Sequence, residues 1–283
     1  DAGRNRCETF DDHARSHLAS RLETESELLG MVERGELRAH FQAMFDTRSG
    51  QPVAVESLAR WAHPRRGLLA AGEFIPVAEE AGQIVTIGDR MIELAIAELD
   101  QLALATGNPA VRAWVNVSVR QLDEPGFTER LRDRLTTPEL IGRVGIEVTE
   151  TAVARDELDT AESLRSLAVA GVPIAIDDFG TGYSSLARLI DFPVDMLKID
   201  QAFVHGVFSR QTMPTVKAIV DLAHAIGARS CAEGIEDPAQ LRCMAELGVD
   251  LLSCYHLGRP VASTELEGTL TLPRLAMMSC RAL

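Results

Sequence analysis

Ile174-Ala175-Ile176-Asp177-Asp178-Phe179-Gly180-Thr181-Gly182-Tyr183 is the strongest indication of the fold, because an apolar run stops there at two adjacent carboxylates and a glycine-rich turn. The apolar run predicts a buried β-strand whose end carries the two aspartates. Neighbouring carboxylates repel each other and lose hydration on burial, so a cation or several hydrogen-bond donors must compensate them. A bound divalent metal is the simplest compensation.

Other β-prone runs end in the same way, with a polar group at or near the C-terminal end. They are 112–118 with Asn116, 144–150 with Glu147 and Glu150, 195–200 with Lys198 and Asp200, and 229–234 with Glu233. Stretches with helical spacing of Leu, Ala and Val lie between them, which indicates repeated β-α units. Groups at the C-terminal ends of parallel strands meet in one basin when eight strands close into a barrel. We therefore expect an α/β fold, a TIM-like (β/α)8 barrel, in which these residues share one site.

Length and composition set the outer bounds. The 283 residues suit one barrel of roughly 250 residues with a short extension. No uninterrupted run of about 18 apolar residues occurs, so we expect no membrane span. The five cysteines lack Cys-x-x-Cys spacing, which argues against a zinc site or a disulfide framework and favours the cytoplasm. A formal net charge of −14 disfavours binding of DNA or RNA polymers, whereas local cations would still admit a small phosphorylated ligand.

Secondary structure can be placed coarsely. Residues 13–36 predict a helical linker, which either packs on its own domain or carries a signal between domains. Strands are expected over 37–46 and 52–60, followed by a loop over 61–67. Helices are expected over 72–106 with a break near Gly82, and over 126–135, 156–170, 184–190, 215–226 and 238–247.

A set of motifs follows in order along the predicted barrel. They are Glu56-Ser57-Leu58-Ala59-Arg60, Phe74-Ile75-Pro76, Asn116-Val117-Ser118, Glu147-Val148-Thr149-Glu150, Asp177-Asp178-Phe179-Gly180-Thr181-Gly182, Leu197-Lys198-Ile199-Asp200 and Ala232-Glu233-Gly234. In this order they resemble the successive motifs of the EAL-domain cyclic-di-GMP phosphodiesterases. Gly3-Arg4-Asn5-Arg6 is similar to the tail of a GGDEF domain. We therefore expect a GGDEF tail over 1–12, an EAL barrel over 37–262 and a C-terminal extension over 263–283, as in the EAL half of a tandem GGDEF-EAL protein.

The resemblance implies a phosphodiesterase that opens cyclic di-GMP to linear pGpG with two Mg²⁺ or Mn²⁺ ions. Oxygen ligands without a His or Cys cluster also favour such hard cations. Carried over by position, Glu56, Asn116, Glu147 and Asp177 hold one ion, and Asp177, Asp178 and Glu233 hold the other. Glu233 is then the candidate general base, and Lys198 orients the water or stabilises developing charge. Without the resemblance, Lys198 could equally be a surface lysine and Glu233 a helix cap.

The resemblance also assigns residues around the metals. Gln42 and Arg60 match positions that contact substrate, and Asp200 is a weaker candidate. Gly180 and Gly182 allow the loop after Asp178 to move, although an ordinary turn would also explain them. Glu150 matches the glutamate that anchors this loop. Because the family loop connects the metals with a dimer interface, we expect a homodimer.

Three positions depart from the family pattern. Ser57 replaces an alanine, Ala43 replaces a proline, and Ser253-Cys254 replaces a Gln-Gly pair. The last change shortens a polar side chain and adds one where glycine allows close approach, so we expect slow hydrolysis. One alternative is a catalytically weak or inactive receptor for cyclic di-GMP. Another is an unrelated metal-dependent barrel enzyme of the aldolase or enolase type, because barrels support many chemistries.

Overall fold

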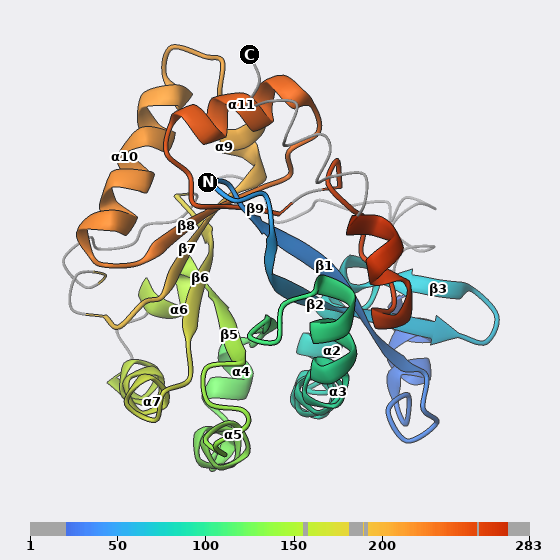
Figure 1. Ribbon diagram of the computed structural model, residues 1–283. Helices are drawn as coiled ribbons and strands as arrows, with labels where there is room; N and C mark the ends of the chain where they lie inside the picture. The colour runs from blue at the N-terminus through green and yellow to red at the C-terminus, as the bar shows by residue number, and fades with distance from the viewer. Residues whose placement is uncertain (1–20, 155–157, 181–188, 190–191, 254, 271–283) are drawn as a thin grey trace, which may run out of the picture.

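Eight strands close into a barrel, and a further strand pairs on its outside (Figure 1). The computed structural model describes residues 21–154, 158–180, 189, 192–253 and 255–270. Around the barrel the order is β1-β9-β8-β7-β6-β5-β4-β2, closed by pairing of β1 with β2, while β3 pairs with β2 alone. The predicted TIM-like barrel is confirmed. The strands are β1 (Leu37–Asp46), β2 (Pro52–His63), β3 (Gly67–Ala70), β4 (Arg112–Asn116), β5 (Val144–Thr149), β6 (Ile174–Phe179), β7 (Met196–Ile199), β8 (Arg229–Glu233) and β9 (Leu251–Ser253).

Strand β1 departs from a purely parallel barrel. It is antiparallel to both β2 and β9, whereas the strands from β2 through β4 to β9 pair in parallel around the rest of the ring. The connection from Asp46 to Pro52 is too short for a crossover helix, so it can only form a hairpin. Asp46 stabilises this turn, because its Oδ1 accepts hydrogen bonds from the backbone N and the hydroxyl of Ser49, both at 2.8 Å.

The hairpin of β2 and β3 corrects the loop predicted over 61–67. Strand β2 continues to His63, and only the turn before Gly67 separates it from β3. Trp61 is completely buried, and its ring lies 5.8 Å from that of Phe74 and 4.7 Å from that of His63. Burial of Trp61 and the ladder to β3 hold this segment extended, although its His-Pro-Arg-Arg sequence is typical of a loop.

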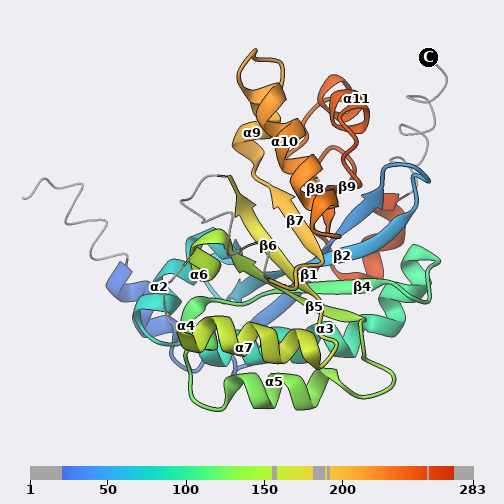
Figure 2. The same ribbon diagram turned by 90° about the vertical axis from the view of Figure 1, so that its left-hand side faces the viewer.

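Helices surround the barrel on the outside, as Figures 1 and 2 show. The predicted break at Gly82 lies between α2 and α3 and has a φ of 73°. The expected helix over 184–190 lies outside the described residues, except for Leu189. The longer helices are α3 (Ile84–Thr106), α5 (Phe127–Leu135), α7 (Leu158–Val169), α10 (Thr212–Ala225) and α11 (Pro238–Glu246). The shorter elements are η1 (Ala71–Glu73), α2 (Ile75–Glu80), α4 (Val119–Leu122), α6 (Glu150–Ala154), α9 (Gln201–His205) and η2 (Ser263–Glu265). No helix in the described ranges has the length and apolar content that crossing a bilayer requires.

The barrel interior contains an apolar layer that is separate from the main core between strands and helices. Trp114 is its largest member, and a Cβ on Gly145 of the next strand would lie 2.5 Å from the Trp114 ring. Glycine at 145 therefore leaves the space that the indole fills. The other buried residues of this layer are Met44, Ala54, Ala175, Met196, Cys231 and Leu251. Because side chains alternate along a strand, the inward-facing residues two positions further along form the next layer, at the C-terminal ends of the parallel strands.

Both flanking segments pack on the barrel. Residues 21–28 are helical, and Leu28 and Met31 are buried in the main core. Trp61 Nε1 donates to Glu36 Oε2 at 3.0 Å, and His63 Nε2 lies 2.8 Å from Glu27 Oε2. The described part of the predicted linker therefore packs on its own domain. At the other end, the described residues 263–270 pack on the barrel through the buried Leu266 and Leu270.

Candidate active site

One layer of inward-facing polar residues occupies the C-terminal end of the barrel. Its members come from consecutive strands: Glu56 from β2, Asn116 from β4, Glu147 from β5, Asp177 from β6, Lys198 from β7 and Glu233 from β8. The strand registers align them, since Asn116 pairs with Glu147 and Glu233 pairs with Ser253. The structure thus brings together residues that lie up to 177 positions apart in the chain.

Lys198 lies at the centre of this layer and is 1% exposed. Its Nζ is 2.6 Å from Glu147 Oε2 and 2.7 Å from Glu233 Oε1. Asp177 Oδ1 follows at 3.1 Å and Glu56 Oε1 at 3.5 Å. Glu56 Oε1 also accepts a hydrogen bond from Asn116 Nδ2 at 3.1 Å. Lys198 is therefore a buried counter-ion for four carboxylates, which excludes the interpretation as a surface lysine.

One ammonium group cannot neutralise four carboxylates, and the pKa values reflect this excess of negative charge. Burial raises the pKa of Glu233 to about 8 despite the opposing charge of Lys198. Burial likewise raises the pKa of Glu147 well above its usual value, and Glu56 and Asp177 add to the shift. For Lys198, burial acts to lower the pKa, but the surrounding carboxylates outweigh it and raise the pKa well above its usual value. The layer therefore retains protons or attracts further cations.

The irregular end of β6 places a second group of acids beside this layer. Asp178 has a φ of 53°, a left-handed conformation that non-glycine residues seldom adopt. Its backbone N donates to Asp177 Oδ1 at 3.0 Å. Burial, the charge of Asp177 and a hydrogen bond with Asp200 raise the pKa of Asp178 to about 6. Asp178 is thus held at the rim, facing Asp200.

Glu150 anchors the turn that follows β6. The backbone N of Gly180 donates to Glu150 Oε2 at 2.8 Å, and Glu150 is 4% exposed. Gly180 has a φ of 102°, and a Cβ there would lie 2.8 Å from the ring of Phe203. Glycine at 180 is therefore required both for the backbone conformation and for packing. Gly182, the other predicted loop glycine, lies outside the described residues.

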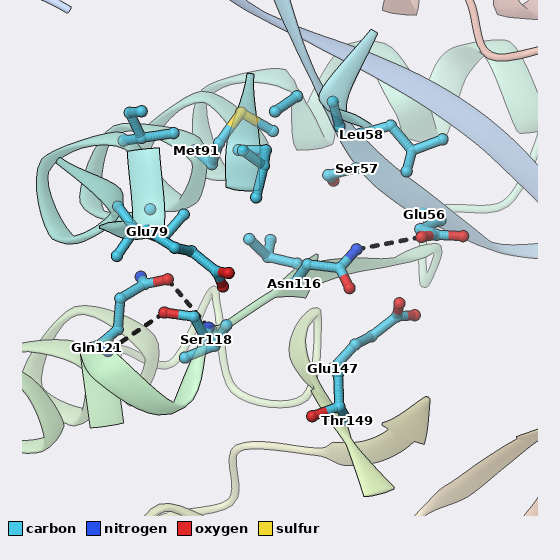
Figure 3. A pocket seen from close by; sticks show the side chains of 18 of the residues that line it. Glu56, Ser57, Leu58, Glu79, Met91, Asn116, Ser118, Gln121, Glu147 and Thr149 are labelled. Carbon is cyan, nitrogen blue, oxygen red and sulfur yellow. Dashed lines mark hydrogen bonds between the residues drawn. The ribbon is translucent and has the colours of Figure 1, made fainter. Parts of the chain in front are cut away.

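Two cavities adjoin the polar layer. The first, of about 280 Å³, lies between the ends of β2, β6, β8 and β9; among the residues that line it are Gln42, Glu56, Asp178, Asp200, Glu233, Ser253 and Tyr255. The second, of about 420 Å³, lies between β2, β4 and α3, and it shares Glu56, Asn116 and Glu147 with the polar layer (Figure 3). Its remaining walls are largely apolar and include Ile75, Ile87 and Met91. A ligand that filled both cavities would cross the carboxylates.

Of the predicted substrate-contact residues, Gln42 and Asp200 line the first cavity, whereas Arg60 is not part of its lining. Gln42 is 6% exposed and its Nε2 donates to the carbonyl of Gly258 at 3.3 Å. Asp200 caps α9, because its Oδ1 accepts from the backbone N of Ala202 at 2.7 Å. Arg60 is half-buried further along β2, and this burial lowers the pKa of its guanidinium. Ser253 is buried in the cavity wall, whereas Cys254 lies outside the described residues.

The carboxylate and amide oxygens of the polar layer fit a hard divalent cation, although in this structure the carboxylates contact Lys198. Within the described ranges, no three or more His, Cys, Asp or Glu side chains form a ready metal site. Glu147 Oε1, however, is buried without a hydrogen-bond partner among the described residues. The available donors are carboxylate and amide oxygens, the ligands that Mg²⁺ and Mn²⁺ prefer. Residual negative charge and a free buried oxygen are the features that a bound cation would satisfy.

Sequence reasoning missed most of the wall of the larger cavity. Ser57 Oγ and Gln121 Nε2 line it, and both are buried without a hydrogen-bond partner among the described residues. Ser57 was recognised only as a departure from the family pattern. A signal for Gln121 existed, because Ser118-x-x-Gln121 has the form of a capping box at the start of a helix.

Comparisons with known proteins agree with this geometry. The EAL domain family model matches residues 25–260. The chain is 34% identical over 268 residues to the bifunctional diguanylate cyclase/cyclic di-GMP phosphodiesterase MucR of Pseudomonas aeruginosa, covering 94% of this chain and 39% of MucR. It is 33% identical over 267 residues to the cyclic di-GMP phosphodiesterase NbdA of the same organism, covering 94% of this chain and 34% of NbdA. The chain thus spans well under half the length of these curated relatives.

Solved structures give the same result. The PaMucR phosphodiesterase in complex with c-di-GMP has a TM-score of 0.80 and 35% identity, covering 86% of this chain and 99% of that one. The EAL domain of Mycobacterium smegmatis DcpA has a TM-score of 0.68 and 31% identity, covering 84% of this chain and 99% of that one. These matches leave no support for an unrelated barrel enzyme of the aldolase or enolase type. With the family model spanning the barrel from the linker helix to Pro260, the chain belongs to the EAL domain family.

Proposed function

We propose that this chain is a metal-dependent phosphodiesterase that hydrolyses cyclic di-GMP to linear pGpG. The observation that carries the proposal is the single basin in which Glu56, Asn116, Glu147, Asp177 and Glu233 surround Lys198. Relatives that cover nearly the whole chain are named as cyclic di-GMP phosphodiesterases, and one of them was solved with c-di-GMP bound. The basin has the donors that hydrolysis of a phosphodiester requires.

Two Mg²⁺ or Mn²⁺ ions fit the donor set. Glu56, Asn116, Glu147 and Asp177 would hold one ion, and Asp177, Asp178 and Glu233 the other. When bound, divalent cations neutralise phosphoryl charge and acidify water, which is the chemistry that opening a phosphodiester ring needs. Asn116 suits such a role because it supplies an oxygen without adding to the negative charge.

The residues of the chain then orient the substrate and move the proton. Glu233 accepts the proton of the attacking water, since its carboxylate lies in the cavity wall with a pKa raised to about 8. Lys198, with a Nζ 2.7 Å from Glu233 Oε1, stabilises the negative charge that develops on the phosphoryl oxygens. Water attacks phosphorus as the bond to one ribose O3′ breaks, so pGpG leaves with a 5′-phosphate and a free 3′-hydroxyl. Arg60, Gln42 and Asp200 hold the substrate around the cavity.

The test is incubation of the purified chain with cyclic di-GMP and Mg²⁺ or Mn²⁺, followed by chromatography of the nucleotides. We expect pGpG to form, and to be absent with a chelator and in the Glu56→Gln and Asp177→Asn variants. Binding of cyclic di-GMP is measured in parallel by calorimetry. Absence of both binding and product in the unaltered chain would refute the proposal.

A second candidate is a cyclic-di-GMP receptor that does not turn over. It is favoured by Lys198, whose ammonium occupies the centre of the carboxylates at 2.6 and 2.7 Å, and by the short Ser253 in the cavity wall. In this case calorimetry would detect binding of cyclic di-GMP, and chromatography would detect no pGpG with either metal. A receptor would also bind in the presence of a chelator, because its affinity would not depend on the cations.

The proposal includes three partners or settings for the chain. A GGDEF domain precedes the EAL barrel in the full-length protein, the barrel forms a homodimer, and it works in the cytoplasm, where the buried Cys231 and Cys243 stay reduced. Sedimentation of the purified chain with and without cyclic di-GMP tests the dimer. A single monomeric species under both conditions would contradict that part of the proposal.

A further inference from the structure

Gly88 lies inside α3, where glycine costs about 1 kcal/mol relative to alanine. A reason for glycine is visible across the helix interface. A Cβ at position 88 would lie 1.8 Å from Gln121 Nε2 and 2.5 Å from Gln121 Cδ. The side chain of Gln121 therefore occupies the volume that any other residue at 88 would need.

Gln121 connects this contact with the polar layer. It is 1% exposed, and its Oε1 accepts from the backbone N of Ser118 at 3.1 Å, while its own backbone N donates to Ser118 Oγ at 3.3 Å. This capping box fixes the turn between β4 and α4 (Figure 3). The last residue of β4, two positions before Ser118, is Asn116, whose Nδ2 donates to Glu56 Oε1.

We infer that Gly88 and Gln121 form an interlock that positions Asn116 for metal binding. The metal-binding role of Asn116 rests on the proposed function, whereas the contact between Gly88 and Gln121 does not. With Gly88 in place, the Gln121 amide packs against α3, and its Oε1 accepts from the backbone N of Ser118. A side chain at 88 displaces the amide, the hydrogen bond from the backbone N of Ser118 to Gln121 Oε1 is lost, and Asn116 is free to leave the polar layer. Gly88 and Gln121 are thus positioning residues that act through Asn116.

The decisive variant is Gly88→Ala, with Gly268→Ala as its matched control. Gly268 also lies in a helical segment, but it is exposed, and a Cβ there would meet nothing within 4 Å. We expect Gly88→Ala to raise the Mg²⁺ concentration for half-maximal rate by about 10-fold or more and to lower kcat, with the KM for cyclic di-GMP less affected. Gly268→Ala should behave as the unaltered chain. Equal Mg²⁺ requirements for both variants would overturn the inference.

Gln121→Ala tests the same contact by removing the side chain that packs against Gly88. Because this variant removes atoms and creates no clash, it remains informative if Gly88→Ala does not fold. It should show the same increase in Mg²⁺ requirement. The double variant should be no worse than the more affected single variant, because both changes remove one contact. Effects that multiply would mean that the two residues act separately and would contradict the interlock.

A crystal structure of Gly88→Ala separates failure of the inference from failure of the proposed function, because it needs no turnover. We expect the Gln121 amide to leave α3 and the 3.1 Å contact between Asn116 Nδ2 and Glu56 Oε1 to be lost. Retention of that contact beside a displaced Gln121 would refute the interlock even if the chain hydrolyses cyclic di-GMP. If the contact between Asn116 and Glu56 is lost in the variant but the unaltered chain does not hydrolyse cyclic di-GMP, the interlock is supported and only the phosphodiesterase proposal is refuted.

Discussion

Lys198 illustrates what single residues in the sequence could and could not indicate. Its position at the end of a predicted strand placed it in the basin, but spacing alone left open a surface role. Only the barrel geometry shows that Nζ meets carboxylates from four different strands. The position of each acid was predictable from strand ends, whereas the identity of their common counter-ion depended on long-range packing.

Replacement of Lys198 by methionine should destabilise the chain and abolish hydrolysis. Removal of one partner from a buried charged group costs about 3 to 5 kcal/mol in the free energy of unfolding, because the carboxylates lose their counter-ion. Urea unfolding measures the cost, and added Mg²⁺ should restore part of it. Lys217→Met is the control, since its ion pair with Asp221 is exposed and contributes about 1 kcal/mol or less. Equal losses in both variants would contradict this account.

Replacement of Glu150 by alanine should loosen the turn that follows Asp177 and Asp178. The variant loses the acceptor for the backbone N of Gly180, so hydrogen exchange of that amide should accelerate. We expect activity to fall by about 10- to 100-fold, as for residues that hold ligands in place. Mass-spectrometric exchange over 177–180 checks the structural effect. Unchanged exchange together with lost activity would assign Glu150 a different role.

At the level of elements, strands β4 to β8 were predictable because each is an apolar run that ends in a polar group. The hairpin of β2 and β3 was not, since its outer residues are polar and resemble a loop, while the burial of Trp61 depends on Phe74 and the linker. The antiparallel β1 had a signal that was missed, namely the short connection between 46 and 52. Docking of 21–36 could not be predicted, because amphipathic spacing does not specify which surface a helix covers.

The linker should contribute to the stability of the barrel through its buried apolar residues. Met31 is 1% exposed, so Met31→Ala should cost about 2 to 5 kcal/mol in the free energy of unfolding. Leu29, two positions away, is 58% exposed, and Leu29→Ala should change it by about 0.5 kcal/mol or less. Chemical denaturation of both variants makes the comparison. Similar values for the two would mean that the linker does not pack as described.

For the whole molecule, the polar residues at successive strand ends predict one shared site, and this prediction could be made from the sequence. The two cavities did not, because a cavity depends on where large side chains stop short of one another. Met91 and Ile87 of α3 leave space beside β2, and no motif encodes that gap. The fold and the polar layer could therefore be predicted, whereas the shape available to a ligand required the structure.

The stability of the metal-free chain should reach its maximum at about pH 5. The pKa of Glu233 is raised from 4.5 to about 8 and that of Asp178 from 3.8 to about 6, so folding favours their protonated forms and stability falls as pH rises through these values. Glu36 and Asp46 have the opposite effect, because folding lowers the pKa of both carboxyl groups. Hydrogen bonds with Arg34 lower the pKa of Glu36 to about 2. The stability that these two groups contribute is lost as pH falls below about 4.

Thermal unfolding between pH 4 and 9, with a chelator or with Mg²⁺, measures this dependence. Because cations bind the deprotonated carboxylates, Mg²⁺ should raise Tm more at pH 8 than at pH 5. Glu233→Gln should remove much of the decline above pH 5. A metal-free chain that is as stable at pH 8 as at pH 5 would show that these acids are not perturbed as described.

The apolar layer around Trp114 closes the barrel beneath the acids. Because the indole fills the space left by Gly145, the described residues of this layer separate the acids from the opposite end of the barrel. A ligand or ion therefore reaches the acids from the C-terminal ends of the strands, and a partner that covered that rim would block its entry.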